Sequence, residues 1–442
     1  MRTDWFCTLN QSKLEEIYVA NRRFSAFLKA GSVPSMITKR DIIIISSIEW
    51  DFQWQIHQEV ASRLANAGNR VLYIENTGVR TPNLRDAKRV ASRLKNSLGS
   101  LFSHGVRVIS PNLHVISPIV LPPFGSPYRR CANRRILLPK IKRVARRLGM
   151  RDPVFWSYLP TDTAVDLIEM MRSSDSAIIY YCGADFSQLT PHVDELRRSE
   201  TALLRMADVV FTFCRPLVEH CEKWNSNVHS VPAGVNLELF PVAGNNGDQA
   251  ASTGSFICKE ITDSLSSLPH PVMGYVGGLH KFVDYGLLRD LARARPNWSW
   301  VFVGAIQTEI NGLAELPNVH MLGQQPHPSL AHYIRQFDVC LIPYLNDRAT
   351  VTALPLKLNE YLALGKPVVS TELPAICAFN EQHQILITAR NQSDSFLCAI
   401  EQALNLQQDE KAMNRRREVA ALGDWQTCLS AMSEKIEAVL QR

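Results

Sequence analysis

Short apolar runs alternate with longer amphipathic segments along most of the chain. Helix-length segments such as Gln58–Ala67 and Thr163–Arg172 separate runs of strand length. In the first half the predicted strands are Ile42–Ser46, Val71–Ile74, Val106–Ile109, Val154–Trp156, Ala177–Tyr181 and Val209–Phe213. Wholly apolar strands are typical of parallel sheets covered on both faces, and their βαβ crossovers are right-handed. The pattern therefore predicts a doubly wound α/β domain.

The rhythm breaks at residues 243–270, where Gly, Asn and Ser predict a linker, and then restarts. The second set of predicted strands is Val272–Val276, Trp300–Val303, Val319–Leu322, Val339–Ile342, Pro367–Ser370 and Ile385–Ile387. The predicted helices are Tyr285–Arg293, Ser329–Gln336, Leu356–Leu364, Ser395–Leu404 and Trp425–Leu440. Such sheets bind ligands beyond the carboxyl ends of their strands. We therefore expect two Rossmann-like domains that face each other across a cleft.

The composition agrees with two globular domains and does not predict a membrane-spanning helix. The 442 residues are 46% hydrophobic and 20% charged, enough to bury two cores. No stretch reaches the roughly 18 to 20 apolar residues that a spanning helix needs. The first 30 residues hold Asp4, Glu15 and Glu16 and no apolar core, so we predict a cytoplasmic protein. Ten cysteines without a CxxC pair predict reduced core thiols rather than a zinc site.

The segment from residue 352 to residue 369 carries the sharpest chemistry. Pro355 suits a first helical turn, and Gly365 suits the stop. Free N–H groups near Leu356 and Lys357, with the lysine's charge, predict a site for a diphosphate. Glu360 on the same helix would accept hydrogen bonds from two ribose hydroxyls. The alternative is a well-capped amphipathic helix with its leucines in the core.

This segment resembles the retaining GT-B glycosyltransferases, particularly family 4 and its group 1 relatives. Glu360 matches the second glutamate of their Glu-x7-Glu motif, which holds the donor ribose, and the first glutamate, which contacts the donor sugar, is Thr352 here. The resemblance spans roughly residues 40 to 440 and is strongest over Asp338 to Pro374. It implies a GT-B fold with an acceptor domain at residues 39–242, a donor domain at 271–422 and a helix at 423–442 that crosses back. Residues 1–38 form an arm to which we assign no role.

Two further donor elements are predicted. Gly277 and Gly278 follow the first strand of the second domain, where glycines let backbone approach a phosphate. The resemblance places Gly278 where relatives carry arginine, which leaves Lys281 and His280 as nearby cations. It also places Gln324 in the loop that lines the nucleotide base. The alternatives are a plain tight turn and a surface loop.

The first domain supplies the candidate acceptor residues. Asp51 and His57 lie in a tryptophan-containing loop after the first strand, and carboxylates with indoles suit sugar binding. Asp185 ends another predicted strand and resembles the aspartate of related sugar transferases. We assign catalytic roles to these three residues. The alternatives are a packing or capping role for His57 and a helix N-cap for Asp185.

A basic stretch stands out from residue 129 to residue 147. It holds nine Lys and Arg residues and no acidic one. It predicts either a solvated helix face or attachment of Arg129–Arg147 to an anionic membrane surface. No recognised nucleic-acid motif accompanies the charge, so we expect no nucleic-acid partner.

The function that the resemblance implies is transfer of a hexose or related sugar from a nucleotide-sugar donor to a saccharide or lipid-linked acceptor. Retention of configuration, no metal and no separate cofactor are implied with it. The expected setting is bacterial surface-polysaccharide assembly, with the protein cytoplasmic and peripheral on the inner face of the membrane. Two alternatives stay open: a sugar-nucleotide epimerase, and a non-catalytic GT-B subunit. The departures at Gly278 and Thr352 keep the second of these open.

Overall fold

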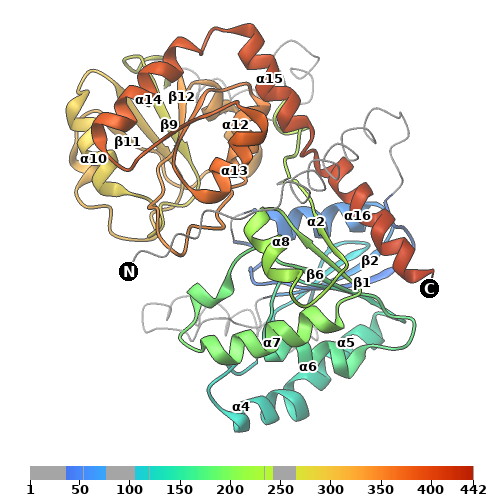
Figure 1. The fold of residues 1–442 in the computed structure, drawn as a ribbon. Coiled ribbons are helices and arrows are strands. Elements are labelled where there is room, and N and C mark those ends of the chain that lie inside the picture. The colour runs from blue at the N-terminus through green and yellow to red at the C-terminus, as the bar shows by residue number, and fades with distance from the viewer. Residues whose placement is uncertain are drawn as a thin grey trace.

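The computed structural model describes residues 36–52, 54–75, 105–118, 120–232, 234–241 and 265–441. Within them the chain forms two α/β domains, each built on one sheet (Figure 1). Residues 1–35 of the predicted arm and 243–264 of the predicted linker lie outside the described residues.

The first sheet has eight strands in the order β3-β4-β2-β1-β5-β6-β7-β8. They are β1 (Asp41–Ile45), β2 (Arg70–Ile74), β3 (Val106–Ser110), β4 (Leu113–Ile116), β5 (Val154–Ser157), β6 (Ile178–Tyr181), β7 (Val209–Thr212) and β8 (Val228–Ser230). All neighbouring strands are parallel except β3 and β4. From β4 to β7 the order is the 3-2-1-4-5-6 order of a doubly wound nucleotide-binding sheet.

The first sheet is covered on both faces, which explains why its strands are apolar throughout. In β1, Ile43 and Ile45 join one buried cluster, whereas Ile42 and Ile44 join the other. The helices of this domain are α2 (Ile56–Asn66), α4 (Pro127–Ala132), α5 (Leu138–Arg147), α6 (Asp162–Met171), α7 (Val193–Met206) and α8 (Arg215–Cys221). A π-helical turn, η2 (Asn133–Leu137), joins α4 to α5, and a 3₁₀ turn, η3 (Phe186–Leu189), precedes α7.

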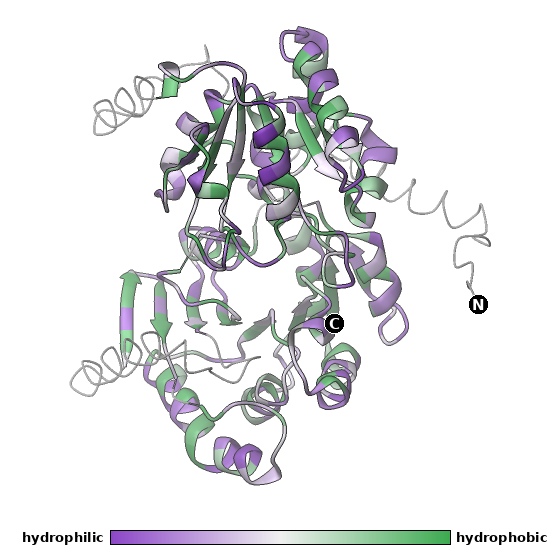
Figure 2. Cartoon of the chain, turned by 90° about the vertical axis from the view of Figure 1, so that its left-hand side faces the viewer, coloured by the Kyte–Doolittle hydropathy of each residue, from purple (hydrophilic) through white to green (hydrophobic). Residues whose placement is uncertain are grey.

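The second sheet repeats the plan with six parallel strands in the order β11-β10-β9-β12-β13-β14. They are β9 (Val272–Val276), β10 (Ser299–Val303), β11 (Val319–Met321), β12 (Val339–Ile342), β13 (Val368–Thr371) and β14 (Ile387–Ala389). The helices are α10 (Tyr285–Ala294), α11 (Leu330–Arg335), α12 (Lys357–Ala363), α13 (Pro374–His383), α14 (Ser393–Asn405), α15 (Glu410–Ala421) and α16 (Trp425–Leu440). Figure 2 shows polar and apolar stretches alternating along the helices, as expected where helices cover a sheet.

The last helix leaves the second domain and packs on the first (Figure 1). Trp425, Leu429 and Ile436 of α16 are buried in the same cluster as Ile42 of β1. A Cβ on Gly234 would lie 2.0 Å from the Trp425 ring, so the indole needs a glycine there. Burial of each such large side chain contributes about 2 kcal/mol, which holds the chain end to the first domain.

Candidate active site

Two glycine turns meet at the carboxyl edge of the second sheet. Gly277 follows β9 with a φ of +121°, and Gly304 follows β10 with a φ of +156°. A Cβ on Gly304 would lie 2.0 Å from the carbonyl oxygen of Gly277, and the Gly304 N–H donates to Gly323 O at 2.7 Å. The sheet order places these turns beside the point where β9 meets β12 and the strand order reverses. That is where doubly wound sheets bind their ligands, and glycine lets backbone line it closely.

Lys357 directs its ammonium group at this edge from the start of α12. Its Nζ lies 3.7 Å from the ring centroid of Tyr275 and 5.4 Å from that of Tyr344. A Cβ on Gly277 would approach the same Nζ to 2.6 Å. Burial lowers the pKa of Lys357 to about 7, with Glu360 raising it in part. The faces of the two aromatic rings stabilise the ammonium when it is charged, against the effect of burial. Lys357 is therefore positioned to contact an anion at the Gly277 turn.

The helix that carries Lys357 is shorter than predicted. It begins at Lys357, and Pro355 precedes it with its carbonyl accepting from the Leu358 N–H at 3.0 Å. It ends before Gly365, whose φ is +73°. Within the described part of the chain, the N–H groups of Leu356 and Lys357 have no hydrogen-bond acceptor. Two free donors therefore lie beside the lysine.

Glu360 is one turn further along α12 and is held by a histidine. Its Oε1 lies 2.9 Å from His327 Nε2, and both side chains are largely buried. Burial lowers the pKa of His327, but the hydrogen bond to Glu360 and the charges of Glu360 and Glu59 outweigh it, so the pKa is raised overall. Glu59 belongs to α2 of the first domain, so this pair lies near the wall of that domain. The arrangement fixes the carboxylate while leaving its second oxygen for a ligand.

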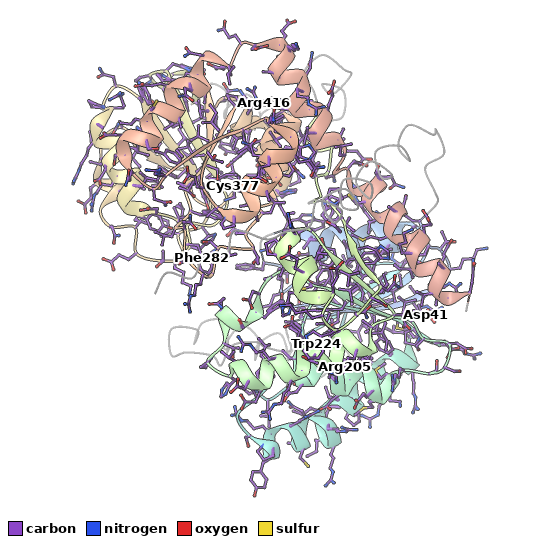
Figure 3. All side chains as sticks on the ribbon, viewed as in Figure 1. Asp41, Arg205, Trp224, Phe282, Cys377 and Arg416 are labelled. Carbon is purple, nitrogen blue, oxygen red and sulfur yellow. The ribbon has the colours of Figure 1, made fainter. Side chains whose placement is uncertain are left out.

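The remaining predicted donor residues lie in loops of the second domain. Lys281 is exposed, with its ammonium 5.1 Å from the Phe282 ring, and Figure 3 shows Phe282 on the side of the domain nearest the first domain. Burial and Lys357 lower the pKa of His280 to about 4, so His280 is neutral near pH 7 and not the cation that the sequence suggested. Gln324 is exposed in its loop. Thr352 lies at the domain interface, where its carbonyl oxygen is 3.8 Å from Cys214 Sγ.

His57 is buried at the switch point of the first sheet. Its Nδ1 lies 2.8 Å from Ser46 Oγ, which also bonds the Tyr73 hydroxyl at 2.6 Å. Its ring stacks on Tyr158 with centroids 3.7 Å apart. Burial lowers the pKa of His57 to about 3, so the ring is neutral at physiological pH. The structure thus gives His57 a packing role within a hydroxyl network.

Asp51 and Asp185 are both exposed but are not brought together with His57 by any contact in the described residues. Asp51 pairs with Arg107, which also pairs with the largely buried Glu75. Asp185 caps η3, accepting from the Ser187 N–H at 3.0 Å. Its other oxygen, Oδ2, accepts only a long bond of 3.4 Å from Gln188 Nε2 and keeps capacity for a ligand.

Several neighbours of Lys357 and Glu360 escaped the sequence reasoning. Tyr275, Gly304, His327 and Tyr344 come from four different strand ends or loops. Only Gly304 gave a local signal, a glycine directly after an apolar strand. The others are ordinary core or loop residues until the sheet order brings them together.

The basic stretch forms α4, η2 and α5, at the end of the first domain remote from the second (Figure 1). Its apolar face is turned inward, since Leu138 and Ile141 are buried in the core. Arg130 and Arg134 pair with Asp166. The basic residues with no acidic partner among the described residues are Arg129, Arg135, Lys140, Lys142, Arg143, Arg146 and Arg147, and Lys142 donates to the Met170 carbonyl at 2.6 Å.

Large apolar side chains accompany these cations on the surface. Tyr128 is 85% exposed and Ile136 is 61% exposed. Among the described residues, no helix has both the length and the hydropathy needed to cross a bilayer.

Two doubly wound domains, with a ligand edge on the second and a last helix returning to the first, define the GT-B class of glycosyltransferase folds. Residues 270–406 match the family model described as Glycosyl transferases group 1. TuaH of Bacillus subtilis (strain 168), a protein named for a glycosyltransferase role in teichuronic acid biosynthesis, is 27% identical over 280 residues, covering 60% of this chain and 67% of TuaH. The second domain is therefore similar to the group 1 glycosyl transferases over residues 270–406, and the fold of the whole chain is of the GT-B type.

Solved structures share the fold at low identity. Sucrose-phosphate synthase from Thermosynechococcus elongatus is 17% identical with a TM-score of 0.62, covering 91% of this chain and 99% of that one. HepE of Anabaena, solved with UDP and glucose, is 12% identical with a TM-score of 0.59, covering 91% of this chain and 99% of that one. The predicted fold class, two facing Rossmann-like domains of the GT-B type, is confirmed.

Proposed function

We propose that this chain transfers a sugar from a nucleotide-sugar donor to an acceptor hydroxyl in polysaccharide or glycolipid assembly. The observation that carries the proposal is the placement of Lys357 and Glu360 on one turn of α12, with Lys357 facing the Gly277 turn. The diphosphate would lie against Lys357 and the free N–H groups, and the ribose against Glu360. The charge that develops on the departing diphosphate would be stabilised by these fixed groups without a metal ion.

The acceptor would enter from the first domain. Asp51 and Asp185 are exposed and would contact acceptor hydroxyls, whereas neutral His57 would support the wall of the site through Tyr158. Family resemblance implies a hexosyl donor and retention of configuration. Domain closure over the donor would exclude water and suppress hydrolysis.

The donor site is tested first by replacing Glu360 with alanine. Loss of two charge-assisted hydrogen bonds to a ribose is expected to weaken nucleotide binding by about tenfold to a hundredfold. The measurement is calorimetric titration of the full chain with UDP, GDP, ADP and dTDP. Glu418→Ala, an exposed carboxylate on α15, serves as the matched control and should bind as the wild type does.

Selective binding of one nucleotide, weakened in Glu360→Ala alone, supports the proposal and fixes the base. Equal binding by Glu360→Ala and Glu418→Ala would show that Glu360 is not part of the donor site. Incubation of the protein with the corresponding nucleotide-sugar then distinguishes a transferase from the two alternative functions. Conversion of the donor sugar without an acceptor would indicate an epimerase, and binding without any turnover would indicate a non-catalytic subunit.

We further propose that the surface of α4, η2 and α5 attaches the enzyme to the inner face of the membrane, near a lipid-linked acceptor. Unpaired cations beside exposed Tyr128 and Ile136 are suited to an anionic bilayer. Each basic residue near such a surface contributes about 1 kcal/mol. The double substitution Arg146→Gln and Arg147→Gln is therefore expected to weaken binding to phosphatidylglycerol-containing vesicles by about thirtyfold.

Vesicle co-sedimentation measures this prediction. The control is Lys411→Gln with Arg415→Gln on α15 of the second domain, which should leave binding unchanged. Binding of equal strength to purely zwitterionic vesicles, or equal losses in the two double variants, would contradict attachment through this surface.

A further inference from the structure

A separate cavity of about 320 Å³ opens in the first domain. It is lined by side chains of α7, of α8 and of the residues just after α8, together with Asp185 and Ser187 at the η3 turn. None of its lining residues comes from the second domain, so it is distinct from the donor edge. We call it the α7–α8 cavity. Its volume lies near the lower end of the range for small-molecule sites, which suits a single sugar residue.

The wall of the cavity is fixed by a buried carboxylate. Glu200 is 6% exposed and accepts from the Tyr180 hydroxyl at 2.8 Å through Oε1. Its Oε2 lies 3.1 Å from His220 Nε2. The hydrogen bond to Glu200 raises the pKa of His220, against the effect of burial. A carboxylate and an imidazole are thus held in one orientation, as expected for a preorganised polar site.

Two cations on the rim lack a counter-charge. Neither Arg197 nor Lys223 has an acidic partner within the part of the chain that the structure describes. Both are exposed, and they come from different helical segments, α7 and the turn after α8. The only carboxylates lining the same cavity are Asp185, which caps η3, and Glu200, which is occupied by Tyr180 and His220. The rim therefore presents two cations that form no ion pair with a described group.

An indole lies beside these cations. Trp224 is 41% exposed, unusual for so large an aromatic ring. The Arg205 guanidinium covers the ring at 4.8 Å, and Figure 3 shows the two side chains next to each other. Arg205 holds the indole in place from outside the cavity lining. An indole fixed in this way offers the apolar contact that the C–H face of a sugar ring takes up.

We propose that the α7–α8 cavity binds an anionic sugar residue of the acceptor, a hexose unit that carries a carboxylate. Trp224 would contact the ring, Arg197 and Lys223 would hold the carboxylate, and His220, which Glu200 orients, would bond a hydroxyl. Asp185 follows β6 at the carboxyl edge of the first sheet and also lines the cavity, so an acceptor chain bound here would extend toward the cleft. The assignment of this sugar to the acceptor rests on the proposed transferase function.

Ligand-observed NMR titration of the full chain tests the site. The probes are methyl β-D-glucuronide, the uncharged methyl β-D-glucoside and inorganic phosphate. The wild type should bind the glucuronide at least about tenfold more tightly than either of the others. Arg197→Gln with Lys223→Gln should abolish this preference, and Trp224→Ala should weaken both glycosides. Arg198→Gln, an exposed neighbour on α7 outside the cavity, should behave as the wild type does.

Nucleotide binding by the same variants is measured in parallel and should not change. Equal binding of the two glycosides would overturn the anionic class, and phosphate binding as tight as glucuronide binding would indicate a plain anion site. Absence of saturable binding, or equal losses in Arg198→Gln, would overturn the site altogether. Glucuronide binding by a chain that binds no nucleotide would support the cavity as a saccharide site while contradicting the transferase proposal.

Discussion

Replacing Lys357 by methionine is expected to weaken binding of the nucleotide-sugar donor by about a hundredfold. The ammonium faces the Gly277 turn between the rings of Tyr275 and Tyr344, and Gly278 supplies no cation there. A hydrogen bond between charged groups contributes about 1.5 to 3 kcal/mol, which corresponds to roughly tenfold to a hundredfold in affinity. Methionine keeps an apolar stem against Tyr275, so the fold should persist. Calorimetric titration with the nucleotide-sugar measures the loss.

The same lysine predicts a pH dependence. With a pKa of about 7 in the free protein, Lys357 is charged below pH 7 and increasingly neutral above it. A bound diphosphate favours the charged form and raises this pKa, so donor affinity should fall as pH rises above 7. A nucleotide-sugar is the right probe, because its diphosphate is esterified at both ends and does not itself titrate in this range.

Lys281→Met provides the comparison. Lys281 is exposed and its charge is screened, so its loss should cost only about threefold. Wild-type affinity in Lys357→Met, or an unchanged pH profile in that variant, would show that another group neutralises the diphosphate.

The fold was predictable because its signals are local and repeated. Apolar strands such as Ile42–Ile45 and Val272–Val276 are bounded by amphipathic helices, and both faces of each sheet are buried. The strands β4 and β8 were missed, since they are short and their residues partly polar. The strand order itself was inferred from class and not from any residue, because it depends on contacts between distant segments.

The donor site, like the fold, was predictable only where its residues are close together in the sequence. Lys357 and Glu360 lie three residues apart on one helix, so their pairing was visible in the sequence. His327 bonds Glu360 across 33 positions, and the Tyr275 ring meets Lys357 across more than eighty, which no local pattern indicates. The catalytic role of His57 stays a prediction, but its burial could not be predicted from its own loop. Its ring stacks on Tyr158, which follows β5, and its Nδ1 meets Ser46, which follows β1.

Gly304→Ala should disable the donor site through the backbone. The added Cβ would lie 2.0 Å from the Gly277 carbonyl oxygen and 2.6 Å from its carbon, and the φ of +156° is one that alanine rarely adopts. Backbone cannot rotate away as a side chain can, so the β9 turn must shift relative to Lys357. We expect a loss of about 1 to 3 kcal/mol in the free energy of unfolding and at least about a tenfold loss of donor affinity.

Gly323→Ala is the control that separates the cost of backbone strain from the effect of displacing the Gly277 turn. Its φ is +67°, but nothing lies within 4 Å of the new Cβ, so it should cost stability of about 1 kcal/mol without displacing Gly277. Thermal unfolding and donor titration of both variants give the two quantities independently. A shift in donor affinity confined to Gly304→Ala would mean that contact between the β9 and β10 turns sets the distance from phosphate to lysine. Equal donor affinity in the two alanine variants would mean that the Gly277 turn does not contact the donor, and α12 alone would then have to hold it.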